Sequence, residues 1–253
     1  MTTQKERTVI VTGAAQGIGY AIAETFVKNS DFVAIFDLNE EAAKSAAEKL
    51  GNAKGYKANV ANEESVKTAV EQVIADRGTV DVLVNNAGLQ FISPVEEFPE
   101  EKWDLVVDVI LKGTFLATKH VLPAMKEQKY GRIITISSGH GRRPDKYKSA
   151  YVAAKYGQIG FTNVVAMENA EYGITANSIL PGPTRTELIE KQLPKLAEKD
   201  GTSVEEALKT HIIGNQWLGR LLEPSEIAAT ALFLASDGAA AITGEALGVT
   251  GGE

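Results

Sequence analysis

The sequence contains no cysteine, only two tryptophans and three methionines, and fewer basic than acidic residues. Without cysteine the chain forms neither disulfides nor thiolate metal sites, which fits a reducing compartment. A formal net charge of −7 argues against nucleic acid or an anionic membrane as the main partner. No apolar run approaches the roughly 18 residues of a membrane span, and the polar segment 1–7 does not resemble a signal peptide. We therefore expect a soluble, cytoplasmic protein.

Short apolar runs alternate with longer amphipathic stretches, and no linker or repeat divides them. Several runs are rich in Val and Ile and apolar on both faces, as buried parallel strands are. The predicted strands are 8–11, 32–36, 54–58, 82–84, 132–137, 175–179 and 246–249. The predicted helices are 19–28, 40–50, 63–77, 100–127, 150–172 and 224–236. This alternation predicts one α/β domain over 1–253, a Rossmann-like, doubly wound parallel sheet of about seven strands with helices on both faces.

The segment 185–214 departs from this alternation. It is a polar, helix-prone insertion before the last predicted helix. A long excursion at this point is more typical of a lid over a binding site than of core packing. We therefore expect a helical substrate lid there.

A glycine-rich turn follows the first predicted strand. Its sequence, Thr12-Gly-Ala-Ala-Gln-Gly-Ile-Gly19, opens the first predicted helix. Glycines let the backbone turn tightly and approach a pyrophosphate, whose charge is favoured at a helix N-terminus. A tight turn without a ligand is the alternative, but the position between the first strand and the first helix favours dinucleotide binding.

Asp37 ends the second predicted strand. A carboxylate there can accept hydrogen bonds from both hydroxyls of an adenosine ribose. The same charge would repel a 2′-phosphate, and no Arg or Lys lies beside it in segment 36–40. Asp37 could instead be a surface helix cap. With the glycine turn in place, we predict NAD rather than NADP as the cofactor.

Tyr151 and Lys155 lie four positions apart, so a helix places the phenol and the ammonium on one face, a turn apart. Tyrosine is a weak acid with an ordinary pKa of about 10. A fixed neighbouring cation favours the phenolate and can bring that pKa into working range. The Tyr-x-x-x-Lys spacing is common by chance, and it becomes evidence for a catalytic pair only together with the other motifs in the chain.

Together these motifs resemble those of the short-chain dehydrogenase/reductase family. The matching pieces, in the family's order, are the turn 12–19, Asn85-Asn-Ala-Gly88, Ser138, Tyr151 with Lys155, and Pro181-Gly182. The resemblance implies that Tyr151 exchanges a proton with the substrate oxygen while hydride moves between substrate carbon and nicotinamide. It also implies that Ser138 orients that oxygen, and that Lys155 lowers the pKa of Tyr151 and holds the nicotinamide ribose. Without the other motifs, Ser138 would be interpreted as a turn residue at the end of a strand, and Lys155 as a solvated charge on a helix.

The resemblance also assigns the cofactor contacts. Asn86, Ala87 and Gly88 would line the adenosine side, and Thr186 would lie near the nicotinamide carboxamide. The catalytic residues so predicted are Ser138, Tyr151 and Lys155. The cofactor-binding residues so predicted are Gly13, Gln16, Gly17, Ile18, Gly19, Asp37, Leu38, Asn59, Val60, Asn86, Ala87, Gly88, Tyr151, Lys155, Pro181, Gly182, Thr184 and Thr186. No metal site is expected, because His120, His140 and His211 lack ligand spacing.

Three positions depart from the family pattern. Ile110 stands where members usually carry an Asn that supports a water relay to the lysine. An Ile side chain cannot hydrogen-bond, so proton delivery would be rewired, slow or absent. Asn59 and Thr250 each stand where Asp is usual, and of these departures Ile110 is the most serious.

Within the family, the stretches 85–95, 137–141, 149–157 and 190–192 are similar to D-3-hydroxybutyrate dehydrogenases. By that likeness Gln90, His140, Lys148 and Gln192 would hold a substrate carboxylate. Pro183 replaces the Trp that usually follows the Pro-Gly motif, which changes one wall of the pocket.

The loop between Ser138 and Tyr151 supports an anionic substrate independently of that likeness. It carries His140, Arg142, Arg143, Lys146 and Lys148, opposed only by Asp145. Such a local positive excess would draw a small anion towards the site. A solvated loop is the alternative, and we expect Arg142 and Arg143 to face solvent.

We therefore expect an NAD-dependent oxidoreductase of a small secondary alcohol and its ketone, with 3-hydroxybutyrate and acetoacetate as the leading pair. The alternatives are a dehydrogenase of another small alcohol, diol or hydroxy-sulfonate, or a nucleotide-binding protein with weak or lost turnover. An acyl-carrier-protein reductase is disfavoured, because that chemistry usually runs on NADPH. By resemblance we also expect a homotetramer that pairs helices 100–127 and 150–172, although Ile159, Phe161, Val164 and Val165 could equally face the chain's own sheet.

Overall fold

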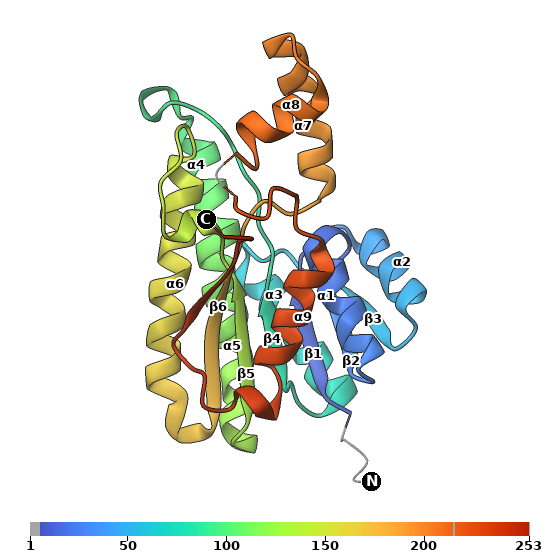
Figure 1. The fold of residues 1–253 in the computed structure, drawn as a ribbon. Coiled ribbons are helices and arrows are strands. Elements are labelled where there is room, and N and C mark those ends of the chain that lie inside the picture. The colour runs from blue at the N-terminus through green and yellow to red at the C-terminus, as the bar shows by residue number, and fades with distance from the viewer. Residues whose placement is uncertain (1–5, 215, 253) are drawn as a thin grey trace.

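A seven-stranded sheet forms the centre of the protein, with strand order β3-β2-β1-β4-β5-β6-β7 (Figure 1). The structure, a computed structural model, describes residues 6–214 and 216–252, without the side chains of residues 188, 191, 192, 195 and 199. Every neighbouring pair of strands is parallel. The strands are β1 Thr8–Thr12, β2 Phe32–Asp37, β3 Ala53–Lys57, β4 Val82–Asn85, β5 Gly131–Ile136, β6 Ile174–Pro181 and β7 Ala246–Val249. The predicted doubly wound fold is confirmed.

Nine α-helices are described on and around this sheet. They are α1 Gly17–Lys28, α2 Glu40–Leu50, α3 Glu63–Arg77, α4 Glu100–Val107, α5 Gly113–Gln128, α6 Ser149–Asn169, α7 Glu187–Asp200, α8 Val204–His211 and α9 Pro224–Leu234. Side-chain caps set the starts of several helices, α2 and α3 among them. Asn39 accepts from the Ala42 N–H at α2, and Asn62 accepts from the Ser65 N–H at α3. No helix in the described part of the chain is both long and apolar enough to cross a membrane.

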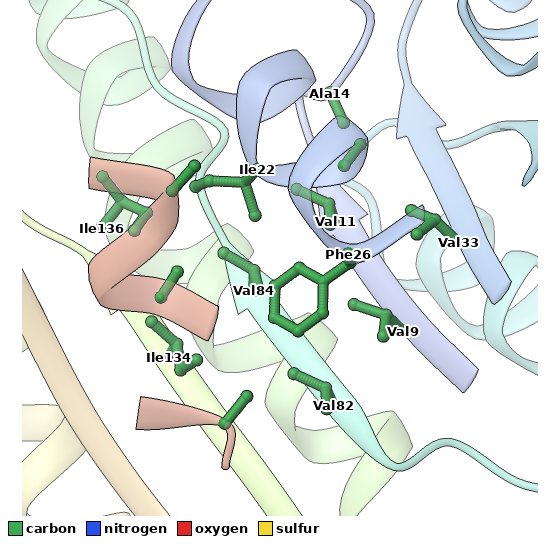
Figure 2. Packing of buried hydrophobic residues seen from close by; sticks show 14 of the residues in the cluster. Val9, Val11, Ala14, Ile22, Phe26, Val33, Val82, Val84, Ile134 and Ile136 are labelled. Carbon is green, nitrogen blue, oxygen red and sulfur yellow. The ribbon is translucent and has the colours of Figure 1, made fainter. Parts of the chain in front are cut away.

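Two apolar layers pack on the two faces of the sheet. On one face, α1, α2 and α9 bury their apolar sides, and the Phe26 ring of α1 lies among Val9, Val82 and Val84 (Figure 2). On the other face α3, α5 and α6 pack, with Val66, Leu116 and Val165 in the layer. Helices on both faces explain why the central strands are apolar throughout.

The predicted helix 100–127 is divided in the structure. A π-helical turn, Asp108–Lys112, separates α4 from α5. The Ile110 carbonyl in this turn accepts hydrogen bonds from Thr114 Oγ1 at 2.7 Å and Gln158 Nε2 at 3.2 Å. A π turn is a local change in helical winding and often marks a functional site. The spacing of apolar residues in the sequence gives no sign of this π turn.

The carboxyl edge of the sheet is where the predicted site residues gather. Strand order reverses between β1 and β4, and ligands of open α/β sheets bind outside the carboxyl ends at such a switch point. The 185–214 insertion forms α7 and α8, which project beyond this edge (Figure 1). The fold thus brings the glycine turn, the Ser138 loop and the α7–α8 segment to one side of the molecule.

Candidate active site

The glycine-rich turn joins β1 to α1 and lies against the loop that follows β4. A Cβ on Gly13 would lie 2.9 Å from Ala87 Cα, and one on Gly19 would lie 2.5 Å from Asn86 Nδ2. Gln16, the residue before α1, gives the helix no side-chain cap. The first N–H groups of a helix need partners. A bare glycine surface beside an uncapped helix N-terminus therefore fits the pyrophosphate of a dinucleotide.

Asn86 ties this turn to the β4 loop. Its Nδ2 donates to the carbonyl oxygens of Thr12 and Gly13, each at 3.0 Å. The backbone N–H groups of Asn86 and Ala87 both donate to Thr12 Oγ1, also at 3.0 Å. These four hydrogen bonds fix the relative position of the two loops, so the Asn-Asn-Ala-Gly motif has a structural role in the cofactor turn.

Asp37 lies at the carboxyl end of β2, next to the same turn. Its carboxylate accepts from the Ala15 N–H at 3.2 Å and the Asn39 N–H at 3.1 Å. Leu38 beside it is 65% exposed. Lys57 of β3 is the register partner of Asp37 across the sheet, a basic neighbour that is invisible in the segment 36–40. The Asp37 carboxylate can accept hydrogen bonds from the hydroxyls of a ribose, which favours NAD. The positive charge of Lys57 would attract a 2′-phosphate, which favours NADP.

Asn59 and Val60, the other predicted adenosine contacts, follow β3. The exposed Asn59 accepts from the Ala61 N–H at 3.1 Å through its side chain. Val60 is buried, and a Cβ on Gly113 would lie 3.0 Å from Val60 Cβ. Asn59 is therefore accessible to a ligand, and Val60 braces the start of α5.

Ser138, Tyr151 and Lys155 line one cavity of about 1030 Å³. Ser138 follows β5 and accepts from the His140 N–H at 3.1 Å. Tyr151 and Lys155 lie one turn apart on α6, with Lys155 Nζ 5.6 Å from the centre of the Tyr151 ring. Lys155 Nζ donates to the Ile136 carbonyl at 2.7 Å. The three side chains converge as their spacing predicts.

Burial dominates the ionisation of this group. Burial raises the pKa of Tyr151 above its ordinary value of 10.0, and the hydrogen bond with Ser138 opposes that rise. Burial also lowers the pKa of Lys155 to about 7. The expectation that Lys155 lowers the pKa of Tyr151 is therefore not met in this structure. Burial disfavours the charged form of Lys155 itself, and its Nζ donates to the Ile136 carbonyl.

Ile110 is fully buried beside Lys155. It packs with Val106, Ala150 and Ala154. A Cβ on Gly88 would lie 3.8 Å from Ile110 Cγ1 and 3.9 Å from Lys155 Nζ, so the two side chains flank the same point. The side chain opposite the lysine is thus apolar and offers it no hydrogen bond.

Gln90, His140 and Lys148 line the same cavity as Tyr151. The His140 and Tyr151 rings meet edge to face with centroids 6.2 Å apart. Lys148 Nζ lies 3.4 Å from His140 Nε2. Burial, followed by the charge of Lys148, lowers the pKa of His140 to about 4. The imidazole is therefore neutral at neutral pH, next to a lysine ammonium.

Of the two arginines of this loop that were expected to face solvent, one does and the other lines the cavity. Arg142 is exposed but donates a hydrogen bond to the Ala246 carbonyl of β7. Arg143 lines the cavity, and its charge helps to lower the pKa of His140. The loop folds back over the site because Ser93 N–H donates to the Tyr147 carbonyl at 2.9 Å, a contact between segments that sequence patterns do not pair.

The remaining predicted residues fall into two groups. Those that line the cavity are Ile18, Asn86, Gly88, Pro181, Gly182, Thr184 and Thr186. Those outside its lining are Gly13, Gln16, Gly17, Gly19, Asp37, Leu38, Asn59, Val60 and Ala87. The side chain of Gln192 lies outside the described residues. Pro183 lines the cavity, as does an α8 segment that includes Lys209 and His211; the predicted lid was the signal for this segment, but no pattern singled out its residues.

Comparisons with known proteins agree with this geometry. The sequence model described as short chain dehydrogenase matches residues 7–197. A D-beta-hydroxybutyrate dehydrogenase of Cupriavidus necator is 37% identical over 250 residues, 97% of each chain. A 3-oxoacyl-[acyl-carrier-protein] reductase, FabG, of Salmonella typhimurium is 38% identical over 244 residues, 96% of this chain and 95% of that protein.

A solved structure extends the likeness to three dimensions. The structure of an actinorhodin polyketide ketoreductase with NADPH has a TM-score of 0.92 and 35% identity, and the match covers 99% of this chain and 98% of that one. The resemblance expected from the motifs, including the likeness to hydroxybutyrate dehydrogenases, is confirmed. The chain belongs to the short-chain dehydrogenase/reductase family, whose members are oxidoreductases that bind a nicotinamide cofactor.

Proposed function

We propose that the protein is an NAD-dependent dehydrogenase that interconverts a short 3-hydroxy acid, such as 3-hydroxybutyrate, and the corresponding 3-oxo acid. The observation that carries this proposal is the pairing of Lys148 with His140 beside Tyr151. An ammonium and an imidazole N–H both bind a carboxylate well. A substrate held there by its carboxylate would present its carbonyl or hydroxyl group to Tyr151 and Ser138.

Ser138 and Tyr151 have separate tasks in this proposal. The nicotinamide, when bound, accepts or donates the hydride. Ser138 Oγ holds the substrate oxygen by a hydrogen bond, which orients the reacting carbon. Tyr151 takes the hydroxyl proton during oxidation and returns it during reduction. Because burial raises its pKa, the Tyr151 phenol is protonated at neutral pH, so reduction is favoured there and oxidation speeds up with rising pH.

Asp37 supports NAD as the cofactor. Its carboxylate is fixed by two backbone N–H groups at the end of β2, where an adenosine ribose would lie. The negative charge of Asp37 would repel a 2′-phosphate. Lys57, the register partner of Asp37 on β3, offsets only part of that charge. We expect kcat/KM for NAD to exceed that for NADP. An Asp37→Ser variant should narrow this ratio by at least about tenfold.

Ile110 supports a second candidate, a nucleotide-binding protein with slow turnover. The buried Ile110 places methyl groups on one side of Lys155, so proton exchange between that lysine and solvent has no side-chain partner at this position. Tight NADH binding without oxidation of any secondary alcohol would favour this candidate. Activity with NAD and any secondary alcohol would eliminate it.

Exposed apolar side chains on α5 and α6 support a homotetramer. Phe115 is 44% exposed, Val164 52% and Met167 83%. By contrast, Val165 is buried and Phe161 packs against the protein's own sheet. We propose that the exposed set pairs with a second copy. Light scattering should give about four times the 27.0 kDa chain mass, and a monomer at micromolar concentration would contradict the proposal.

Substrate choice is tested by initial rates of NADH formation at pH 8–9. The substrates are both enantiomers of 3-hydroxybutyrate, 2-butanol, 2,3-butanediol and a hydroxy-sulfonate, each with NAD and with NADP. We expect one enantiomer of 3-hydroxybutyrate with NAD to give the highest kcat/KM. A higher kcat/KM for the neutral alcohols would contradict an anionic substrate but keep the oxidoreductase. A higher kcat/KM with NADP would contradict the assignment of Asp37.

A further inference from the structure

Asp145 is the only acidic residue among the described residues that line the cavity. The formally basic residues around that lining are Arg143, Lys146, Lys148, Lys155 and Lys209. A single carboxylate in a basic site is a feature that the proposed reaction does not use, and it lies at the end of the cavity assigned to the substrate carboxylate.

The Asp145 carboxylate contacts the two groups assigned to the substrate. Its Oδ2 lies 2.6 Å from Lys148 Nζ and 3.3 Å from His140 Nε2. The contact with Lys148 has the length of a charge-assisted hydrogen bond, and His140 Nε2 lies just beyond hydrogen-bond range of the same oxygen. One oxygen of Asp145 therefore already takes the place of an anion between Lys148 and His140.

The position of Asp145 allows it to leave. Its side chain is 38% exposed, whereas those of Lys148 and His140 are 21% exposed. It lies in the exposed loop segment 144–147, whose residues line the cavity. A side-chain rotation towards solvent would release Lys148, with loss of the hydrogen bond that the carboxylate accepts from the Lys146 backbone. Partial burial opposes the charged form of Asp145, but the hydrogen bond and the charge of Lys148 outweigh it and lower the pKa of this carboxyl below its ordinary value.

We propose that Asp145 is a specificity-determining residue whose carboxylate occupies the anion position between Lys148 and His140 until a substrate carboxylate displaces it. This inference rests on the proposed function. Two carboxylates cannot share one ammonium at close range without repulsion. Anions that bind weakly therefore leave Asp145 in place, and only a substrate with further contacts along the cavity displaces it. Affinity for a short carboxylate is lower than Lys148 and His140 alone would give.

The experiment measures the dissociation constant of butyrate, a carboxylate that lacks the reacting hydroxyl, by calorimetry with NADH present. The variants are Asp145→Asn and Asp145→Ser, which remove the charge, and Asp145→Glu, which keeps it. Asp104→Asn is the matched control, because Asp104 is an exposed residue of α4 outside the cavity. Melting temperature and NADH affinity show that each variant is folded.

We expect butyrate to bind about three- to fivefold more tightly to Asp145→Asn and Asp145→Ser, as for the loss of one partly exposed ion pair. Asp145→Glu and Asp104→Asn should match the unmodified protein. Unchanged or weaker binding in both neutral variants would overturn the inference and make Asp145 a residue that only positions Lys148. Absence of butyrate binding in all variants would overturn it as well. If butyrate binds as expected but 3-hydroxybutyrate is not oxidised, the proposed substrate fails while the role of Asp145 stands.

Discussion

Replacing Lys155 with Met should make the protein more stable at neutral pH. Lys155 is 3% exposed, and burial lowers its pKa from 10.5 to about 7. A lysine that prefers water this strongly destabilises the fold that buries it. Met has a similar length and no charge, so it can occupy the same space between Tyr151 and Gly88.

The magnitude follows from the pKa shift. A change from 10.5 to about 7 corresponds to about 5 kcal/mol of destabilisation, with little solvent screening to reduce it. The variant also loses the hydrogen bond from Lys155 Nζ to the Ile136 carbonyl, which leaves a buried acceptor unpaired at a cost of about 1–3 kcal/mol. We therefore expect the free energy of unfolding at pH 7 to rise by about 2–4 kcal/mol in Lys155→Met.

The sign of the pH dependence follows from proton binding. Between pH 7 and 10.5 the unfolded chain holds the lysine proton and the folded protein does not, so stability of the unmodified protein rises with pH. Below pH 7 both states hold the proton and the destabilisation is complete. Above pH 10.5 neither state holds it and the destabilisation is gone. The advantage of Lys155→Met should accordingly shrink from pH 7 to pH 10.

Urea unfolding at pH 7 and pH 10, without cofactor, measures this difference. Lys67→Met is the matched control, because Lys67 is exposed on α3, and it should show no such trend. The reasoning is refuted if Lys155→Met is less stable than the unmodified protein at pH 7 by the same amount as at pH 10. That result would mean that the Lys155 ammonium is solvated in the folded protein.

Two further predictions test the cofactor turn and the imidazole. Gly19→Ala should weaken NADH binding at least about tenfold, because its Cβ would lie 2.5 Å from Asn86 Nδ2 and from the Gly13 carbonyl; Gly160→Ala, with nothing within 4 Å, should bind NADH normally. Equal NADH affinity in the two variants would contradict a close approach at the turn. His140→Asn should gain up to about 2 kcal/mol of stability relative to the unmodified protein between pH 7 and pH 4.5, because the unfolded chain binds the His140 proton before the folded protein does. A stability difference that is the same at both pH values would show that His140 titrates normally.

The fold was predictable because its signals are local. Runs of Val and Ile mark β1, β2, β4, β5 and β6, and each strand begins and ends within two residues of its prediction. Asn39 and Asn62 cap α2 and α3 through contacts within one helical turn, which is also a local feature. The order of motifs along the chain then places the site at the carboxyl edge, because parallel strands deliver all their ends to one side.

The electrostatics of the site were not predictable, because they depend on contacts between distant segments. Lys57 reaches the position of Asp37 only through the register of β2 and β3. Lys155 donates a hydrogen bond to the Ile136 carbonyl of β5. Burial by segments distant in the sequence is the largest cause of the pKa shifts of Lys155 and Tyr151. The opposing charge of Asp145 is visible in the sequence, but its contact with both Lys148 and His140 is not.

The central claim is that Lys148 binds the carboxylate of a substrate that reacts at Tyr151. The most direct measurement is kcat/KM with NAD for racemic 3-hydroxybutyrate and for 2-butanol, in the unmodified protein, in Lys148→Met and in the Lys67→Met control. The account predicts that Lys148→Met lowers kcat/KM for 3-hydroxybutyrate by about tenfold or more relative to 2-butanol, while Lys67→Met leaves the ratio unchanged. An equal loss for the charged and the neutral substrate, or no loss for either, would contradict it.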